Sequence, residues 1–214
     1  MKRIFIAFAL LLATVFSVQA QDSDNTYYKP NTGALTTEVL FTDFARISLN
    51  NGLVRGRYFL TEQSALRLGL GIDYNYNQIN DEAHSTSVGI TLAPGIEKHF
   101  NGTNRLSPYV GLELPLSIRA SSYDDEDLSI TGATDFNGDG RGYIGAGLNA
   151  VAGVDFYFVK NFYVGLEIGA GINYRKFSDM EISSDVAGNS RRQGFSNLDF
   201  SQFANGGLRI GFAF

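Results

Sequence analysis

The chain lacks cysteine and tryptophan, and beyond its N-terminal residues it lacks any long apolar run. Without cysteine it can form neither a disulfide nor the lipid-modified cysteine of a lipoprotein. Without long apolar runs it cannot be a bundle of membrane-spanning helices, each of which needs about 20 consecutive apolar residues. Basic residues are also scarce, with 17 Lys and Arg against 22 Asp and Glu, and this balance argues against a nucleic-acid partner.

The first residues show the order of features found in a secretory signal peptide. Two basic residues precede an apolar run that is broken only by Thr14, and small residues surround a cleavage position after Ala20. We therefore expect residues 1–20 to be cleaved on export and residues 21–214 to form one domain, with an exposed lead over 21–32. Loss of the two basic residues leaves 15 basic against 22 acidic residues, so the exported protein carries a net charge of about −7.

Apolar residues alternate with polar or small residues in eight segments of the chain. The C-terminal segment shows this most clearly, because Leu208, Ile210, Phe212 and Phe214 alternate with glycine, arginine and alanine. Alternation with a period of two is typical of a strand that has one apolar face. The apolar sets of the other segments lie at 35–41, 54–60, 66–74, 88–96, 110–118, 146–156 and 164–174. An even number of strands, each about ten residues long, predicts an all-β fold, an eight-stranded antiparallel transmembrane β-barrel.

The connections between the predicted strands alternate between short and long. Short turns are expected near 61–64, 101–104 and 159–161, and longer polar loops near 42–51, 77–85, 121–142 and 176–200. Outer-membrane barrels have short periplasmic turns and longer extracellular loops, so this asymmetry predicts that both chain ends lie in the periplasm. A last strand that ends on Phe214 is also typical of these barrels. We expect its alternating apolar residues to be the signal that the barrel-assembly machinery binds.

Aromatic residues gather at the predicted strand ends, as expected for the two interfacial girdles of a membrane barrel. On the short-turn side these are Tyr58, Phe100, Tyr109, Phe158, Phe162 and Phe214, and on the loop side Tyr74, Tyr76, Tyr143, Tyr174 and Phe177. Both sets are expected to lie at the membrane surface.

Alternation alone does not say which face points inward, because a soluble lipocalin-like barrel has the same pattern with its apolar face inside. The polar face here is rich in glycine, which weakens strands and has no steric purpose on an exterior that faces water. Inside a narrow barrel, glycine leaves room for long charged side chains, so we place this face in the lumen and the apolar face towards lipid. The charged residues of the inner face are expected to pair with one another as a lumen charge network. They are Arg55, Arg57, Arg67, Asp73, Glu113, Arg119, Asp155, Glu167, Arg175 and Arg209.

One loop segment matches the first half of a calcium-binding loop. Asp135, Asn137 and Asp139 supply oxygen atoms at alternate positions, and Gly140 allows the sharp turn that such loops need. The closing carboxylate is missing, because its position falls at Ala146 inside a predicted strand. A weak Ca²⁺ site is one interpretation. The other, an acidic loop tip in water that needs no cofactor, is favoured.

Only 2 histidines are available for catalysis. Some outer-membrane barrels modify lipid A with a histidine and a serine at one rim, but His84 falls in a long loop and His99 beside a short turn, at opposite ends of the barrel. Neither shows a carboxylate–His–Ser arrangement in its spacing. We therefore expect no catalytic residues, and interpret His84 as a loop residue and His99 as a residue of the periplasmic interface.

A short repeat links two of the predicted hairpins, because the sequence Tyr-Val-Gly-Leu-Glu occurs at 109–113 and again at 163–167. Together with the segment Gly56–Thr61 and the terminal Phe214, these strand openings resemble the small, opacity-protein-like outer-membrane barrels of the porin family, of the type found in Bacteroidetes. The resemblance covers essentially the whole exported chain. It implies the fold and the membrane, but it transfers no catalytic motif.

The sequence thus predicts a non-enzymatic barrel in the outer membrane of a Gram-negative bacterium, with a structural or surface-interaction role and a charge-plugged lumen. The expected partners are outer-membrane lipids, lipopolysaccharide and the barrel-assembly machinery, and the protein is expected to be a monomer. The sequence does not identify an extracellular ligand. Two alternatives stay open: a narrow porin-like channel for small solutes and, less favoured, a lipid A-modifying enzyme.

Overall fold

The computed structural model describes residues 29–41, 54–186 and 188–214, so the predicted signal peptide and the first long loop lie outside the described residues. Within these ranges the chain forms strands, and no helix there is long and apolar enough to cross a membrane. The strands are β1 (Leu35–Phe41), β2 (Val54–Thr61), β3 (Ser64–Gln78), β4 (His84–His99), β5 (Leu106–Glu113), β6 (Leu116–Asp125), β7 (Leu128–Thr131), β8 (Tyr143–Val159), β9 (Phe162–Phe177), β10 (Met180–Ser184), β11 (Ser190–Arg192) and β12 (Ser196–Ala213).

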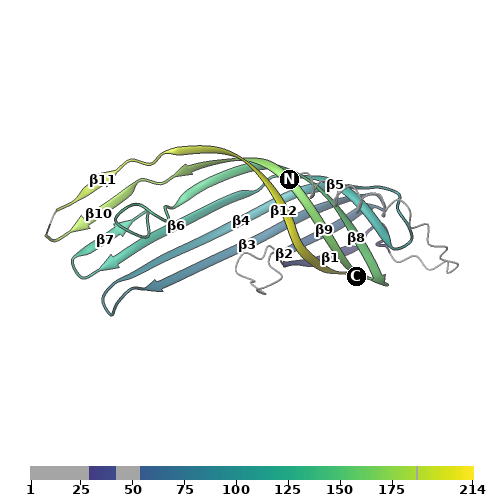
Figure 1. Ribbon diagram of the computed structural model, residues 1–214, viewed down its shortest axis with the longest axis horizontal. Coiled ribbons are helices and arrows are strands. Elements are labelled where there is room, and N and C mark those ends of the chain that lie inside the picture. The colour runs from purple at the N-terminus through teal and green to yellow at the C-terminus, as the bar shows by residue number, and fades with distance from the viewer. Residues whose placement is uncertain (1–28, 42–53, 187) are drawn as a thin grey trace, which may run out of the picture.

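The strands close into a ring with eight positions, in the order β1, β2, β3, β4, β5 with β6, β8, β9 and β12. All pairings are antiparallel, and the ring closes where β1 pairs with β12, from Thr36↔Ala213 to Phe41↔Leu208. One position is shared, because β5 and β6 both pair with β4 and with β8. Pro115, which has no N–H to donate, lies between them. The prediction of an eight-stranded antiparallel barrel is confirmed (Figure 1).

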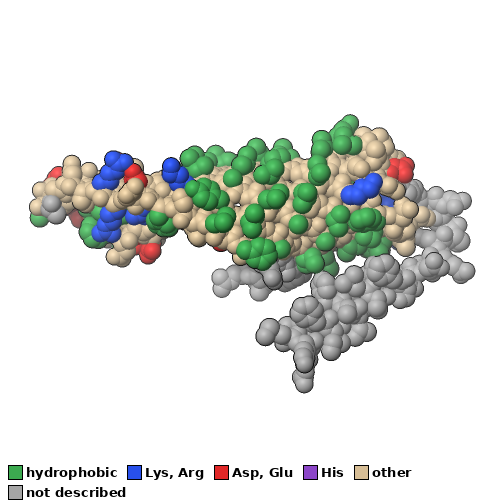
Figure 2. All heavy atoms as spheres, turned by 90° about the horizontal axis from the view of Figure 1, so that it is seen from above, with side chains coloured by type: hydrophobic (Ala, Val, Ile, Leu, Met, Phe, Trp, Pro, Cys, Tyr) green, Lys and Arg blue, Asp and Glu red, His purple; other side chains and the backbone are tan. Residues whose placement is uncertain are grey.

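The apolar residues of the ring strands point outward, and the charged and small residues point inward. Leu68, Ile90 and Leu112 lie on the outer face with about half of each side chain exposed, whereas Arg67 and Glu97 on the inner face are buried. In the space-filling view the apolar side chains gather over the middle of the molecule, and the charged ones lie mainly towards its ends (Figure 2). A belt of exposed apolar side chains around a barrel is the surface that contacts lipid.

Several ring strands are longer than the sequence pattern predicts. β3, β4, β8, β9 and β12 have 15 to 18 residues. A strand of this length spans about 50 Å, roughly twice the height of the apolar band of a membrane barrel. The loop predicted at 77–85 is therefore shorter than expected, because antiparallel pairing continues through polar residues from Tyr74↔Val88 to Gln78↔His84.

Two other predicted loops also contain strands, which form an extension beyond the ring. β6 pairs with β7, β7 with β10, and β10 with β11, at the end of the molecule where the long loops lie (Figure 1). Ile130, Ala133, Met180 and Ile182 form a small buried apolar core within this extension. The sequence pattern did not predict these strands, because the segments are polar and aspartate and glycine interrupt their short stretches of alternation.

Asp179 ties the base of the extension together. Its carboxylate accepts hydrogen bonds from the Arg191 guanidinium and, at 2.7 Å, from the backbone N–H of Gly194. These hydrogen bonds hold the pKa of Asp179 below its usual value, because they stabilise the charged form. The contribution of this contact to stability is therefore present at neutral pH and is lost as the pH falls through the lowered pKa.

Glycine on the inner face makes room for the charged side chains. A Cβ atom at Gly165 would lie 2.6 Å from Nη2 of Arg209 and 2.5 Å from Oδ1 of Asp155. A Cβ atom at Gly95 would lie 2.8 Å from Cγ of Arg67. Because nonbonded atoms do not approach so closely, any larger residue at these positions would displace the charged side chains.

Replacement of Gly165 by Ala is therefore expected to destabilise the barrel by about 1–3 kcal/mol, the usual cost of overpacking a filled interior. Gly56 on the outer face provides the control, because the nearest atom to a Cβ there would be the backbone oxygen of Thr36, at an ordinary 3.6 Å. Urea unfolding of the two variants in detergent micelles measures the difference. Equal stability of the Gly165→Ala and Gly56→Ala proteins would show that the lumen has spare room beside Gly165.

Candidate functional site

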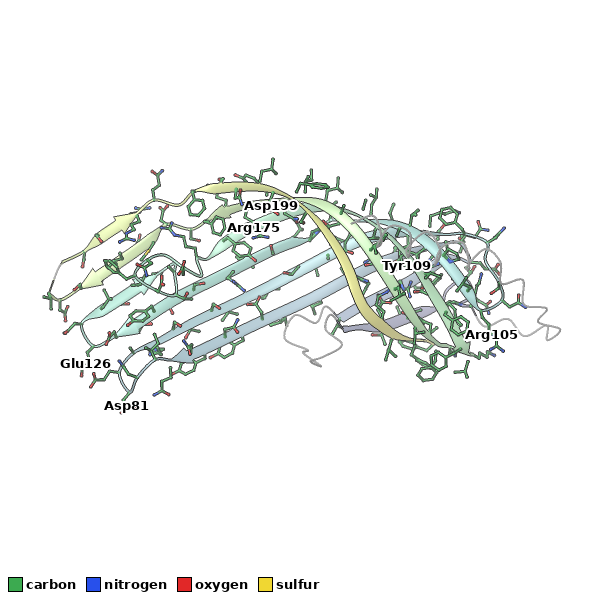
Figure 3. The ribbon with its side chains drawn as sticks, viewed as in Figure 1. Asp81, Arg105, Tyr109, Glu126, Arg175 and Asp199 are labelled. Carbon is green, nitrogen blue, oxygen red and sulfur yellow. The ribbon has the colours of Figure 1, made fainter. Side chains whose placement is uncertain are left out.

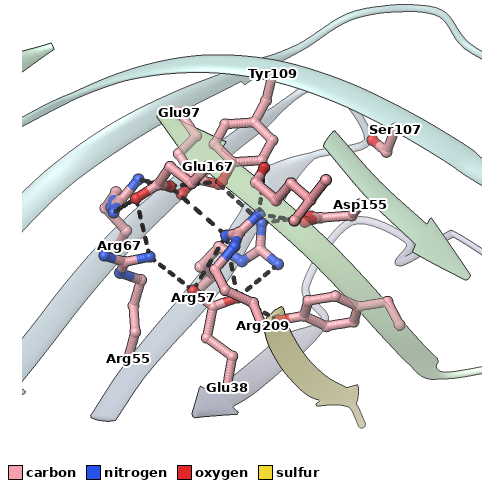
Figure 4. Close-up of polar contacts among 12 residues, drawn as sticks. Glu38, Arg55, Arg57, Arg67, Glu97, Ser107, Tyr109, Asp155, Glu167 and Arg209 are labelled. Atoms are coloured by element: carbon pink, nitrogen blue, oxygen red, sulfur yellow. Dashed lines mark hydrogen bonds and ion pairs between the residues drawn. The ribbon is translucent and has the colours of Figure 1, made fainter. Parts of the chain in front are cut away.

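Charged side chains from all eight ring positions meet inside the barrel (Figure 4). We call this set the lumen cluster, and its members are Glu38, Arg55, Arg57, Arg67, Glu97, Glu113, Asp155, Glu167 and Arg209. None of them is more than 7% exposed. The cluster lies towards the short-turn end, as the neighbouring Tyr109 shows: it is nearer to Arg105 at that end than to Asp81 and Glu126 at the other (Figure 3).

Two ion pairs of the lumen cluster join opposite strands. Nη1 of Arg57 on β2 lies 2.7 Å from Oδ2 of Asp155 on β8. Nη1 of Arg67 on β3 lies 3.0 Å from Oε2 of Glu167 on β9. In each pair the two strands are four positions apart in the ring, which is the largest separation that eight positions allow. These side chains therefore cross the lumen and do not simply follow its wall.

The carboxylate of Glu38 has three cationic neighbours in the cluster. It lies 2.9 Å from Nη1 of Arg55, 3.2 Å from Nη2 of Arg57 and 3.3 Å from Nη1 of Arg209. The hydroxyl of Tyr163 also donates a hydrogen bond to it, at 2.7 Å. Burial of an isolated charge costs several kcal/mol and is tolerated where the charge is paired and hydrogen-bonded. Each member of the lumen cluster therefore depends on the others for its compensation.

Seven of the ten charged residues predicted for the lumen network belong to the lumen cluster. Asp73 and Arg119 instead form a separate ion pair, with 2.9 Å between Oδ1 and Nη2. Arg175 forms no ion pair among the described residues and lies against Tyr143. Glu38 and Glu97 belong to the cluster although they are not among the residues predicted for it. The alternation of their own strands marks both as inward-facing, and this signal could have found them.

His99 was predicted at the periplasmic interface, but it faces the lumen and is buried. Its Nε2 lies 3.1 Å from Oε2 of Glu97, and its Nδ1 lies 2.9 Å from Oγ of Ser107. A carboxylate, a histidine and a serine thus meet in space although their spacing did not reveal it. Ser107 is only 4% exposed, so this hydroxyl is not accessible to a lipid substrate.

Three aromatic residues predicted for the girdles also lie on the inner face, and they are Tyr109, Tyr143 and Phe177, which pairs in register with Tyr143. Tyr109 is buried, and its hydroxyl donates a 2.6 Å hydrogen bond to Glu167. Tyr143 contacts Arg119 and Arg175, whose guanidinium carbons lie 5.8 and 5.6 Å from the ring centroid. The predictions were wrong because they used position along the strand, whereas alternation places all three residues on the inner face. Exposed outer-face members of the girdles are Tyr58, Phe100, Phe158, Phe162, Phe214, Tyr74, Tyr76 and Tyr174.

The predicted assembly signal lies on β12 and the residue that follows it. Ile210 and Phe214 are exposed on the outer face, and the ring of Phe212 lies 4.6 Å from that of Phe162. The backbone of Leu208 pairs with Phe41, while its side chain lies outside the described residues. That the assembly machinery binds these residues stays a prediction.

The segment that matches a calcium loop is closed by its own hydrogen bonds. Oδ1 of Asp135 accepts hydrogen bonds from the backbone N–H groups of Gly138 and Asp139, at 2.8 and 2.7 Å. In the part of the chain that the structure describes, no three His, Cys, Asp or Glu side chains are close enough together to hold a metal ion. Asn137 therefore lies beside no cluster of metal-ligating side chains. The carboxylate of Asp135 stabilises the turn through its two hydrogen bonds to the backbone.

Comparisons with known proteins agree with a membrane barrel. The sequence matches the model of the OmpA-OmpF-like porin family over residues 75–214, which is more than half of the chain. No curated protein matches the chain.

Three solved structures are similar. The N-terminal β-barrel domain of OprF from Pseudomonas aeruginosa is 18% identical, and the match covers 86% of this chain and 100% of that domain, with a TM-score of 0.38. The attachment invasion locus protein Ail from Yersinia pestis is 14% identical over 85% of this chain and 94% of its own, with a TM-score of 0.40. The outer membrane protein OprG from Pseudomonas aeruginosa is 11% identical over 88% of this chain and 99% of its own, also with a TM-score of 0.40.

Proposed function

This chain belongs to the OmpA-OmpF-like porin family and is an outer-membrane β-barrel, and we propose that it has a structural, surface-presenting role with a closed lumen. The porin-type prediction is thereby confirmed, while the Bacteroidetes type stays a prediction. One observation carries the proposal of closure. The pairs Arg57–Asp155 and Arg67–Glu167 join opposite walls, and all four side chains are inaccessible to solvent.

The proposed orientation places the short turns and the C-terminus in the periplasm of a Gram-negative bacterium. The longer connections and the extension of β7, β10 and β11 would then lie outside the cell, as is usual for barrels of this class. The extension has its own apolar core, so it would present a fixed surface beyond the lipid. The barrel would act as a monomer, with outer-membrane lipids and lipopolysaccharide around its apolar belt and the barrel-assembly machinery as its partner during insertion.

A closed lumen predicts that the refolded protein in a planar lipid bilayer conducts ions far below the level of a general porin. The double variant Arg57→Ala/Arg67→Ala removes one partner from each cross-lumen pair and should raise this conductance. Arg192→Ala in the extension is the control and should not change it, because Arg192 lies outside the lumen and contacts Phe136. The alternative function is a narrow channel. It would be supported if the wild-type protein conducted ions at the level of a porin and the double variant had the same conductance.

A lipid A-modifying function is disfavoured by the positions of the histidines. His84 and His99 are the first and last residues of β4, and a strand of 16 residues separates them by about 50 Å. Replacement of both by Ala is expected to leave the lipid A profile of the producing cells unchanged. Gel mobility of unheated samples checks that the variant barrel is folded, and a changed profile from a folded variant would favour the enzyme.

A further inference from the structure

The inner face has a second charged level, and it is built differently from the lumen cluster. Arg175 and Asp199 lie between Tyr109 and the long-loop end of the barrel (Figure 3). The ion pair of this level, Asp73–Arg119, joins β3 and β6, which are two positions apart in the ring. Both side chains of this pair keep 30% exposure although they face inward. Water therefore enters this half of the lumen, whereas the lumen cluster below excludes it.

Polar side chains of the upper level lie flat against glycines of neighbouring strands. A Cβ atom at Gly89 would lie 2.8 Å from Cγ of Asp73, which shows that Asp73 rests on β4. A Cβ atom at Gly145 would lie 3.5 Å from Cγ of Arg175, so the stem of Arg175 rests on β8. Asp73 and Arg175 therefore follow the wall, unlike the side chains of the lumen cluster that cross the lumen.

The same arrangement continues towards the cluster. A Cβ atom at Gly171 would lie 2.9 Å from Cγ of Asn149, and Asn149 Oδ1 is buried without a hydrogen-bond partner in the described residues. Asn149 pairs in register with Glu113 of the lumen cluster. The polar wall therefore reaches down to the charged residues that close the lower half.

The upper level also contains a cation without an acidic partner. Five of the six arginines of the inner face form ion pairs, namely Arg55, Arg57, Arg67, Arg119 and Arg209. Arg175 forms none among the described residues, and its guanidinium lies over the ring of Tyr143, which the guanidinium of Arg119 also contacts. A planar guanidinium with unused N–H donors suits the oxygen atoms of a carboxylate or a phosphate group.

We propose that the upper half of the lumen is a blind cup, open at the long-loop end, that binds a small oxyanion through Arg175 beside Tyr143 and Arg119. The shared chemistry is a carboxylate or phosphate group that accepts hydrogen bonds from the guanidinium of Arg175. The lumen cluster forms the floor of the cup. The proposal goes beyond the proposed function, and it rests on that function only in that the closed lower lumen makes the cup blind.

Isothermal titration of the refolded full-length protein in a zwitterionic detergent tests the proposal, with succinate and inorganic phosphate as separate probes. At least one of the two probes should bind the wild-type protein. Arg175→Gln should weaken this binding about tenfold or more, because it removes a charged hydrogen-bond donor. Arg192→Gln, which removes an arginine from the extension, should bind as the wild type does. The mobility shift of unheated samples shows that each variant is folded.

The outcomes separate the two proposals. Binding of succinate alone or of phosphate alone identifies the preferred group. No heat with either probe, or equal weakening by Arg175→Gln and Arg192→Gln, would overturn the cup as a binding site. Conductance measurements test closure independently, because oxyanion binding in detergent does not require that the lower lumen exclude ions.

Discussion

Replacement of Arg57 by Met is expected to destabilise the folded barrel by about 3–5 kcal/mol, the effect of removing one partner from a buried ion pair. Arg57 is fully buried, with Asp155 at 2.7 Å and both Glu38 and Glu97 at 3.2 Å. The variant keeps an unbranched side chain in place of the stem of arginine but leaves three arginines against five carboxylates in the lumen cluster. The loss is therefore mainly the uncompensated burial of negative charge.

Equilibrium urea unfolding in lipid vesicles, followed by the mobility of unheated samples, measures this change. Arg192→Met is the matched control, because the same substitution outside the lumen should change stability by no more than about 0.5 kcal/mol. The double variant Arg57→Met/Asp155→Asn should be less destabilised than the sum of its parts, since the two residues are in contact. A loss below about 1 kcal/mol for Arg57→Met would show that water compensates the carboxylates and that the lumen is not closed there.

Replacement of Leu68 by Arg is expected to cost about 2–4 kcal/mol, the range for an arginine on the lipid face near the bilayer midplane. Leu68 lies on the outer face of β3, half-exposed and paired with Pro94 and Gly56 on the neighbouring strands. An arginine at this position must either enter hydrocarbon or bend towards a headgroup region, and both cost free energy.

The control for this variant is Val186→Arg, since Val186 is exposed in the extension, away from the apolar belt. Both variants gain the same charge, so the difference between their unfolding free energies measures the cost of placing that charge in lipid. If Leu68→Arg were as stable as Val186→Arg, the apolar face would not be in hydrocarbon. This result would favour a soluble, lipocalin-like barrel.

The sequence pattern was sufficient for the architecture because each strand carries its orientation in its own residues. Alternation identified the apolar faces, and glycine on the opposite face indicated a filled lumen, as the close approach of Gly165 to Arg209 shows. The number of ring strands followed from the same pattern. The proline between β5 and β6 did not change the predicted number of strands, because the apolar alternation continues through Pro115.

The contacts within the lumen cluster could be predicted from the sequence less completely than the architecture. Alternation marks Arg57 and Asp155 as inward-facing, but the tilt and stagger of the strands decide that these two meet across the lumen. The burial of His99 beside Ser107 depends on the same stagger. The extension was missed for a different reason, since its short strands are stabilised by a core of Ile130 and Met180 from segments far apart in the chain.

Because the chain has no cysteine, single cysteines can be introduced along β3 and labelled with a nitroxide, one position at a time from 66 to 72. Electron paramagnetic resonance in lipid vesicles then measures how strongly oxygen, which concentrates in hydrocarbon, and a water-soluble nickel chelate relax each label. In the proposed barrel the apolar face meets lipid while the charged face is enclosed. We expect oxygen accessibility to peak at Leu66, Leu68, Leu70 and Ile72 and to fall at the positions between them. Peaks at the intervening positions, or strong relaxation of the labels at the leucines by the nickel chelate, would contradict it.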